Sequence, residues 1–165
     1  MSATDTITGT TIQPPAPGTV DYKLEVLTIP VSDVDRAKAF YASLGWREDA
    51  DFPIRPDFRV IQMTPPGSSS SIIFGSGVTA AQPGSYEGLV LAVYDVEVAR
   101  EDLIARGVDV SEIWHGRSGF DRFGDAEREP GRDPEGTSYG SWASFSDPDG
   151  NTWLLQEIQT RLPGR

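Results

Sequence analysis

The sequence predicts a mixed α+β domain built from two copies of one β-α-β-β-β unit. Residues 31–37 match residues 93–99 at a spacing of 62, and Gly45 matches Gly107 at the same spacing. The second copy closes on residues 147–151, Asp-Pro-Asp-Gly-Asn, which favour a tight turn between two β-favouring runs. Matches in a strand, a helix start and a helix end at one spacing indicate an internal repeat.

The first copy is expected over residues 22–77. Residues 22–31 have the pattern of a strand, and Asp33 is a good helix N-cap. An apolar stripe with helical spacing follows, and Gly45 supplies the stop. Three strands should complete this copy, over residues 46–52, 58–64 and 70–75, with Pro53 and Pro56 interrupting the first of them.

The second copy is expected over residues 87–158, after a connector over residues 78–86. Asp95 caps its helix and Gly107 ends it. Strands are expected over residues 87–93, 108–114, 139–145 and 152–158.

A long irregular loop is expected over residues 115–138. The turn glycines Gly67 and Gly150 are 83 residues apart, whereas the matching helices of the two copies are 62 residues apart. The second copy is therefore 21 residues longer, and this loop contains the additional residues. A loop of this length is usually functional, such as a lid, or disordered. We expect a disordered tail over residues 1–21 and a polar tail over residues 159–165.

The composition excludes several classes of protein. The formal charge of −11 argues against binding to nucleic acid or to an anionic membrane surface. The absence of cysteine excludes disulfides, thiolate metal sites and a cysteine nucleophile. No apolar run reaches the roughly 20 residues that a membrane span needs, and the first residues do not have a secretory signal. We therefore expect a cytoplasmic protein whose partner is a small molecule, with a homodimer also allowed.

The Val-x-Asp-Val-Asp-Arg-Ala opening and the Asp-Pro-Asp-Gly-Asn closing hairpin resemble the vicinal oxygen chelate superfamily, which includes glyoxalase I, extradiol dioxygenases and bleomycin-resistance proteins. The resemblance covers residues 23–158. It implies the glyoxalase/bleomycin resistance/dihydroxybiphenyl dioxygenase fold, in which two β-α-β-β-β modules form an incomplete barrel around a cavity and the helices lie outside.

The resemblance also implies four ligand positions for a divalent metal, on the first and last strands of the modules. In this sequence they are occupied by Val26, Ser71, Gly88 and Leu154. Divalent metals need imidazole or carboxylate ligands, so we expect no metal and no other cofactor there. Three carboxylates lie next to or near these positions, but strand alternation should turn them to the opposite face: Glu25, Glu87 and Glu157.

Seven side chains are candidates for the wall or mouth of the cavity: Val26, Thr28, Gln62, His115, Trp142, Leu154 and Gln156. His115, the only histidine, is either an acid/base group at the mouth or a loop histidine. Gln62 either binds a ligand or marks the wet face of its sheet. Trp114 and Trp142 either stack on a ligand or pack in the core, and Trp153 is expected in the core.

The function that these features favour is metal-independent binding of a small apolar or aromatic molecule, which it would sequester, as in the bleomycin-resistance branch. The alternative is an enzyme, a glyoxalase-like lyase or isomerase or a dioxygenase, with relocated metal ligands or with metal-free acid/base chemistry. A non-catalytic module that uses its edges to dimerise is a third hypothesis. The sequence leaves the question of catalysis open.

Overall fold

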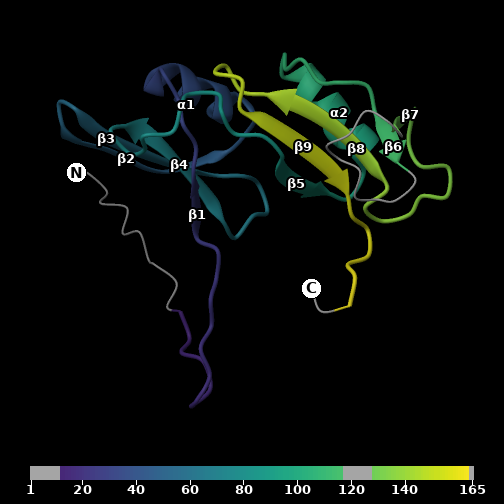
Figure 1. Cartoon of the computed structure of the whole chain (residues 1–165), viewed down its shortest axis with the longest axis horizontal. Helices are drawn as coiled ribbons and strands as arrows, with labels where there is room; N and C mark the ends of the chain where they lie inside the picture. Colours follow the sequence, from purple (N-terminus) through teal and green to yellow (C-terminus); the bar gives the residue numbers. More distant parts are fainter. Residues whose placement is uncertain (1–11, 117–127, 164–165) are drawn as a thin grey trace, which may run out of the picture.

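The computed structural model describes residues 12–116 and 128–163, and it contains two sheets, each with one helix packed against it (Figure 1). The first module has strands β1 (Val26–Thr28), β2 (Arg47–Arg55), β3 (Phe58–Thr64) and β4 (Ser71–Ser76), with helix α1 (Val34–Ser43). Its strand order is β1-β4-β3-β2, with β1 and β4 parallel. Of the tail expected over residues 1–21, residues 1–11 lie outside the described residues.

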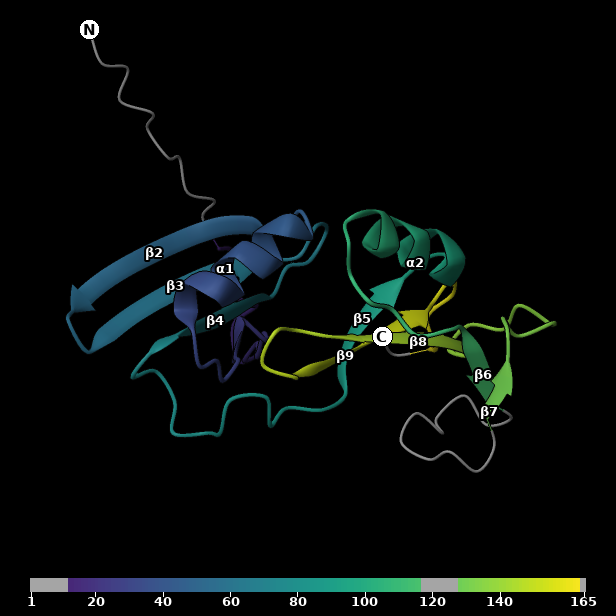
Figure 2. The same ribbon diagram turned by 90° about the horizontal axis from the view of Figure 1, so that it is seen from above.

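The second module repeats this plan with an additional short strand. It has β5 (Leu89–Val93), β6 (Trp114–Gly116), β7 (Arg128–Pro130), β8 (Ser141–Ser146) and β9 (Thr152–Glu157), with helix α2 (Val96–Ala105). The strand order is β5-β9-β8-β6-β7. The two sheets lie side by side, with a long connection between them (Figure 2). The expected mixed α+β class and the two-module architecture are therefore confirmed.

Helix starts and stops follow the predicted residues. The Asp33 carboxylate accepts a hydrogen bond from the Arg36 backbone N–H, and the Asp95 carboxylate accepts from two backbone N–H groups. Gly45 and Gly107 have φ values of +80° and +85°, which an L-residue adopts only at a cost. These residues end α1 and α2 because the left-handed conformation cannot continue the helix.

Several strand boundaries differ from the expected ones. β2 continues through Pro53, which was expected to interrupt it; because β2 is an edge strand, a missing N–H is tolerated there. β1 contains only the three residues that pair with β4, instead of residues 22–31. Residues 108–113 form no continuous strand, with one bridge between Val110 and Phe145. Within the loop expected over residues 115–138, β6 and β7 pair, and residues 117–127 lie outside the described residues.

Each sheet has a helix side and a side opposite the helix, which we call the far side. On the helix side of the first module, Ile61, Met63, Ile72 and Phe74 pack beneath α1. On the helix side of the second module, Phe145, Trp153 and Leu155 belong to the same apolar core. The expected core position of Trp153 is confirmed. One core therefore joins the helix sides of both modules.

The closing turn over residues 147–151 is docked on the first module. The Asp149 carboxylate accepts hydrogen bonds from the Ser32 side chain, from the Ser32 backbone N–H at 3.1 Å, and from Arg36 at 3.0 Å. The Asn151 side-chain amide donates to the Pro30 carbonyl at 2.9 Å, across 121 residues of sequence. The turn residues are thus turn formers, as expected, and they also join the two modules.

A buried hydroxyl completes this junction. The Tyr41 hydroxyl donates to the Asp147 carboxylate at 2.9 Å and accepts from the Trp153 indole N–H at 3.2 Å. Burial, together with the negative charge of Asp147, raises the pKa of Tyr41 well above its ordinary value. The hydroxyl therefore stays protonated and can serve as the donor to Asp147.

Candidate functional site

The far side of the second module carries an aromatic and aliphatic surface with a pocket beside it. Strand register places Trp114 opposite Trp142 and Trp142 opposite Gln156, while Leu154 lies opposite Ser144. Trp114, Trp142 and Leu154 form a buried cluster of their own, separate from the main core. A cavity of about 290 Å³ adjoins this cluster, lined by Glu87, Gly88, Trp114, Arg128, Ser144, Thr152 and Leu154.

Trp114 gives this pocket both an apolar surface and an uncommitted polar atom. Its indole N–H is buried and has no hydrogen-bond partner in the described part of the chain. Buried donors are usually paired, because leaving one unpaired costs about 1–3 kcal/mol. The Arg128 guanidinium lies 4.4 Å from the centre of the Trp114 ring, in cation–π geometry. The pocket therefore combines a flat apolar wall with a positive charge.

Glu87 also lines the pocket, contrary to the expectation from strand alternation. The structure gives Gly88 a φ of +70°, and β5 begins only at Leu89, so the regular alternation does not extend back to Glu87. Both Glu87 and Gly88 face the same cavity. The expectation that Glu87 points to the opposite side was wrong because the backbone turns at Gly88.

The far side of the first module holds three of the predicted residues. Register places Thr28, Ile73 and Gln62 in one row across the sheet, and Val26 beside Ser71 in the next row. All of them lie on the side away from α1. This surface is open: Phe52 and Ile54 on β2 are about 60% exposed.

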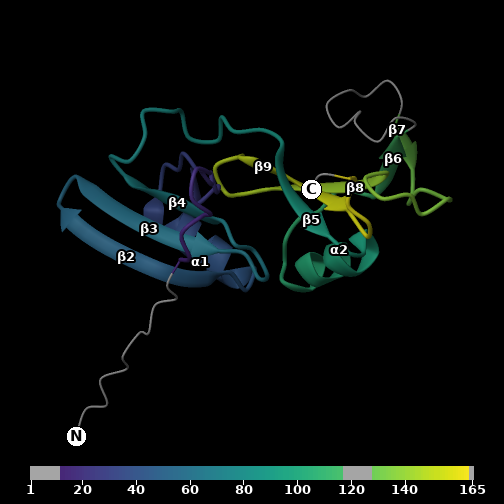
Figure 3. The ribbon, with the colours of Figure 1, turned by 90° about the horizontal axis from the view of Figure 1, so that it is seen from below.

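The predicted residues therefore form two groups. Val26, Thr28 and Gln62 lie on the sheet of the first module. Trp142, Leu154 and Gln156 lie on the sheet of the second. No strand of one sheet pairs with a strand of the other within the described ranges, and the sheets extend in opposite directions from the shared core (Figure 3).

Two of the predicted residues are almost fully buried in the sheet and do not line this pocket. Trp142 is 2% exposed and Gln156 is 6% exposed. The Gln156 side-chain amide donates to the Tyr139 carbonyl at 3.3 Å. Leu154 is the predicted residue of this group that lines the pocket.

His115 lies on the opposite side of the second sheet from this pocket. On the neighbouring strands, His115 lies opposite Ser141 and Glu129. The adjacent residue, Trp114, has other partners, so the two side chains point to opposite sides of the sheet. The His115 Nδ1 atom lies 2.9 Å from the Gly131 carbonyl oxygen, and Nε2 lies 3.5 Å from the Glu129 carboxylate. The ring thus connects β6 to the segment after β7 and does not reach Leu154's side of the sheet.

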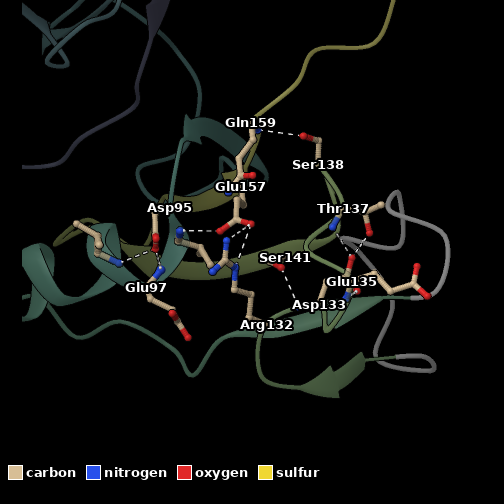
Figure 4. Close-up of polar contacts among 12 residues, drawn as sticks. Asp95, Glu97, Arg132, Asp133, Glu135, Thr137, Ser138, Ser141, Glu157 and Gln159 are labelled. Atoms are coloured by element: carbon tan, nitrogen blue, oxygen red, sulfur yellow. Dashed lines mark hydrogen bonds and ion pairs between the residues drawn. The ribbon is translucent and has the colours of Figure 1, made fainter.

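Glu157 is fully buried on the helix side, as alternation predicted (Figure 4). One carboxylate oxygen accepts from the Val96 backbone N–H at 3.1 Å, and the other accepts from the Arg132 guanidinium at 2.9 and 3.1 Å. The start of α2 is a favourable place for a negative charge. Glu157 is therefore committed to anchoring α2 and Arg132.

The residues at the family's metal positions do not fit a divalent metal. Val26 and Ser71 are direct register partners, and Gly88 and Leu154 line one pocket. Neither pair supplies an imidazole or a carboxylate, and the Ser71 hydroxyl is already hydrogen-bonded to Thr64. Across residues 12–116 and 128–163, no three His, Asp or Glu side chains are grouped closely enough to hold a metal ion.

Of the seven residues that line the pocket, Leu154 was among the seven sequence candidates and the other six were not. Ser144 has the same parity as Trp142 on β8, so alternation alone could have found it. Thr152 likewise shares the parity of Leu154 on β9. Arg128 lies in a stretch without apolar periodicity, where the sequence gives no signal. Larger hollows of about 420 and 500 Å³ lie elsewhere, beside β5 and beside α2.

Comparison with known families identifies the class of protein. The family model described as the Glyoxalase/Bleomycin resistance protein/Dioxygenase superfamily matches residues 23–155. The chain belongs to this superfamily, as its opening and closing motifs indicated. A comparison with curated proteins finds no match. No helix in the described residues is long and apolar enough to span a bilayer.

Solved structures support the same assignment. TnmS3, an antibiotic binding protein from Streptomyces sp. CB03234, is 29% identical, with a TM-score of 0.63, covering 85% of this chain and 98% of its own. A glyoxalase/bleomycin resistance protein from the same organism is 30% identical, with a TM-score of 0.60 and coverages of 82% and 100%. A superfamily member from Sphaerobacter thermophilus DSM 20745 is 28% identical, with a TM-score of 0.60 and coverages of 84% and 98%.

Proposed function

We propose that this protein binds a small, largely apolar or aromatic molecule on the far sides of its sheets, without a metal, and so sequesters it. The observation that carries the proposal is the pocket beside Trp114 and Leu154. It occupies a position where the family resemblance places metal ligands, yet it pairs the apolar surfaces of Trp114 and Leu154 with polar side chains that can orient a ligand: Glu87, Arg128, Ser144 and Thr152. The likeness to an antibiotic binding protein supports a small molecule as the ligand.

The size of the pocket indicates that it holds only part of the binding site. Its volume of about 290 Å³ is near the lower end of the range for drug-sized ligands, roughly 300–1,000 Å³. The far side of the first module, with exposed Phe52 and Ile54, does not line it. We propose that a second copy of the chain covers these surfaces in a homodimer, and that the protein works in the cytoplasm.

The test is direct binding of a small aromatic probe. Addition of 1-naphthol should quench tryptophan fluorescence saturably, and an excess of EDTA should leave its dissociation constant unchanged. A Ser144→Phe substitution should weaken binding about tenfold or more, because the new ring fills the pocket. The matched control is Ser146→Phe on the same strand, at an exposed position outside the pocket lining.

Three results would contradict the proposal. These are an absence of saturable quenching, equal effects of the two phenylalanine variants, or binding that requires added metal. Sedimentation of the protein across a concentration series would test the homodimer separately.

Glu87 gives a specific reason to keep metal-free catalysis as the second candidate. It is the carboxylate that lines the pocket in the described residues, next to the Trp114 wall. A carboxylate beside a bound molecule can act as an acid or a base. Turnover of a bound compound that is lost in Glu87→Gln, with binding retained, would favour this function over sequestration.

A further inference from the structure

Four polar side chains form a continuous chain of hydrogen bonds on the far side of the first module. The Asp49 carboxylate contacts the Thr64 hydroxyl, which lies 2.6 Å from the Ser71 hydroxyl. The Ser71 oxygen then accepts from the Gln62 side-chain amide at 3.2 Å. Thr64 and Ser71 are 5% and 8% exposed, so water has little access to the middle of this chain.

A local irregularity of β2 brings Asp49 to this position. Register runs from Glu48 opposite Met63 directly to Ala50 opposite Gln62, which leaves Asp49 as the extra residue of a bulge. A bulge redirects a side chain that regular alternation would turn elsewhere. Here it places the Asp49 carboxylate against Thr64.

The direction of every hydrogen bond in the chain follows from the charge of Asp49. Burial raises the pKa of this carboxyl, but hydrogen bonds from Arg47 and Thr64 outweigh that effect and hold the pKa below its usual value. An ionised carboxylate only accepts, so the single Thr64 hydroxyl hydrogen points to Asp49. The Ser71 hydrogen must then point to the Thr64 oxygen, and the Ser71 oxygen accepts from Gln62.

This order leaves the two ends of the Gln62 amide with different roles. The nitrogen is turned toward Ser71, and the carbonyl oxygen has no hydrogen-bond partner among the described residues. Gln62 is only partly buried, in the row that also contains Thr28.

We propose that Asp49 is a positioning residue which, through Thr64 and Ser71, fixes Gln62 with its carbonyl oxygen presented to the ligand. The first module then selects a ligand with a hydrogen-bond donor, a hydroxyl or an N–H, at this point. The selection of ligand rests on the proposed function, whereas the fixed orientation of Gln62 does not.

An Asp49→Asn substitution should reverse the chain. Arg47 donates to one oxygen of the Asp49 carboxylate and Thr64 to the other. An asparagine would keep its oxygen on Arg47 and place its NH₂ group against Thr64. Thr64 would then donate to Ser71, Ser71 would donate to Gln62, and the Gln62 amide would turn its nitrogen outward.

The orientation of Gln62 can be measured without any ligand. In ¹⁵N NMR spectra, the Gln62 side-chain signals are identified by their loss in Gln62→Leu. In the unsubstituted protein, one of the two amide protons should exchange with water about tenfold more slowly than the other. In Asp49→Asn both should exchange rapidly, and Asp57→Asn, at an exposed turn carboxylate, should match the unsubstituted protein.

A Thr64→Val substitution provides a second route, should Asp49→Asn fail to fold. It breaks the chain without changing any charge and should also abolish the difference between the two protons. Equal exchange of the two protons in the unsubstituted protein, or retention of the slow proton in both Asp49→Asn and Thr64→Val, would overturn the proposed role of Asp49.

Ligand selection is tested with a matched pair of probes, 1-naphthol and 1-methoxynaphthalene. The naphthol should bind about tenfold more tightly, since only it can donate to Gln62. Asp49→Asn should remove or reverse this preference, and an unchanged preference would overturn the proposal. If neither probe binds, the proposed function fails, while the exchange measurement still decides the orientation of Gln62.

Discussion

The two modules share one plan but distribute polar and apolar groups in opposite ways. On the far side, the first module has a polar chain from Asp49 to Gln62 on an open surface, whereas the second has the buried Trp114, Trp142 and Leu154 cluster. On the helix side, the first module is apolar beneath α1, whereas the second contains the buried carboxylate of Glu157.

This difference shows how a repeated unit acquires two roles. The second sheet is covered on both sides, so its far side contributes to stability as well as to the pocket. The far side of the first sheet is open at β2, where Phe52 and Ile54 are exposed, so these positions can vary with little effect on folding. Substitutions at these exposed positions of the first module should therefore be tolerated, whereas substitutions in the cluster of the second module should change both stability and the shape of the pocket.

The largest expected effect is the difference in the free energy of unfolding between Leu154→Ala and Phe52→Ala. Leu154 is 4% exposed in its cluster, so its truncation should lower the free energy of unfolding by about 2–5 kcal/mol. Phe52 is 60% exposed, so its truncation should cost about 0.5 kcal/mol or less. Urea unfolding followed by circular dichroism measures both values. Similar losses in the two variants would refute the contrast between the far sides.

The next effect concerns the junction between the modules. Tyr41→Phe removes the hydroxyl that joins Asp147 to Trp153 and leaves both partners buried, so stability should fall by about 1–3 kcal/mol. The matched variant is Tyr94→Phe, because Tyr94 is 74% exposed and should show no measurable change. A Tyr41→Phe protein as stable as the parent would show that the hydroxyl is dispensable.

The helix caps give a smaller and more closely matched comparison. Asp33→Ala and Asp95→Ala should each cost about 1 kcal/mol, the usual value for an N-cap. Asp95 accepts from both Glu97 and Val98, whereas Asp33 accepts only from Arg36 among the described helix amides, so the second variant should lose more. Thermal melts of the two proteins at one pH test the order. The opposite order would show that cap geometry does not set the difference.

The smallest effect at neutral pH should come from Asp51 on the edge of the first sheet. Hydrogen bonds from Arg59 and Lys38 hold the pKa of Asp51 well below its ordinary value near 3.8. This contribution to stability is present above pH 4 and is lost as the pH falls further and the carboxylate takes up a proton. The free energy of unfolding of Asp51→Asn should therefore fall less between pH 7 and pH 3 than that of the unsubstituted protein, as measured by urea unfolding. An unchanged difference would contradict this assignment.

Much of the fold followed from local patterns. Asp33, Gly45, Asp95 and Gly107 set the helix limits, and the turn over residues 147–151 formed where its residue types require it. These features depend on backbone chemistry within a few residues, which a sequence displays directly. The side assigned to Glu157 was also correct, since regular alternation holds inside β9.

The candidate site was less predictable, because it depends on irregular backbone and on long-range packing. The positive φ of Gly88 turned Glu87 into the pocket, and the bulge at Asp49 created a polar chain that alternation does not suggest. Arg128 reaches Trp114 from a stretch without periodicity. The seven predicted residues also lie on two sheets, an arrangement that no local pattern specifies.

The docking of the closing turn has a consequence for the kinetics of folding. The turn over residues 147–151 binds residues between Pro30 and Tyr41, across separations of 106–121 residues. During synthesis, the first module leaves the ribosome long before these partners exist, so its junction surface must wait for the end of the chain. Such distant contacts give a high contact order, for which refolding in milliseconds to seconds is typical. Docking of the closing turn of the second module is therefore a late step in folding, and it completes the structure of the first module.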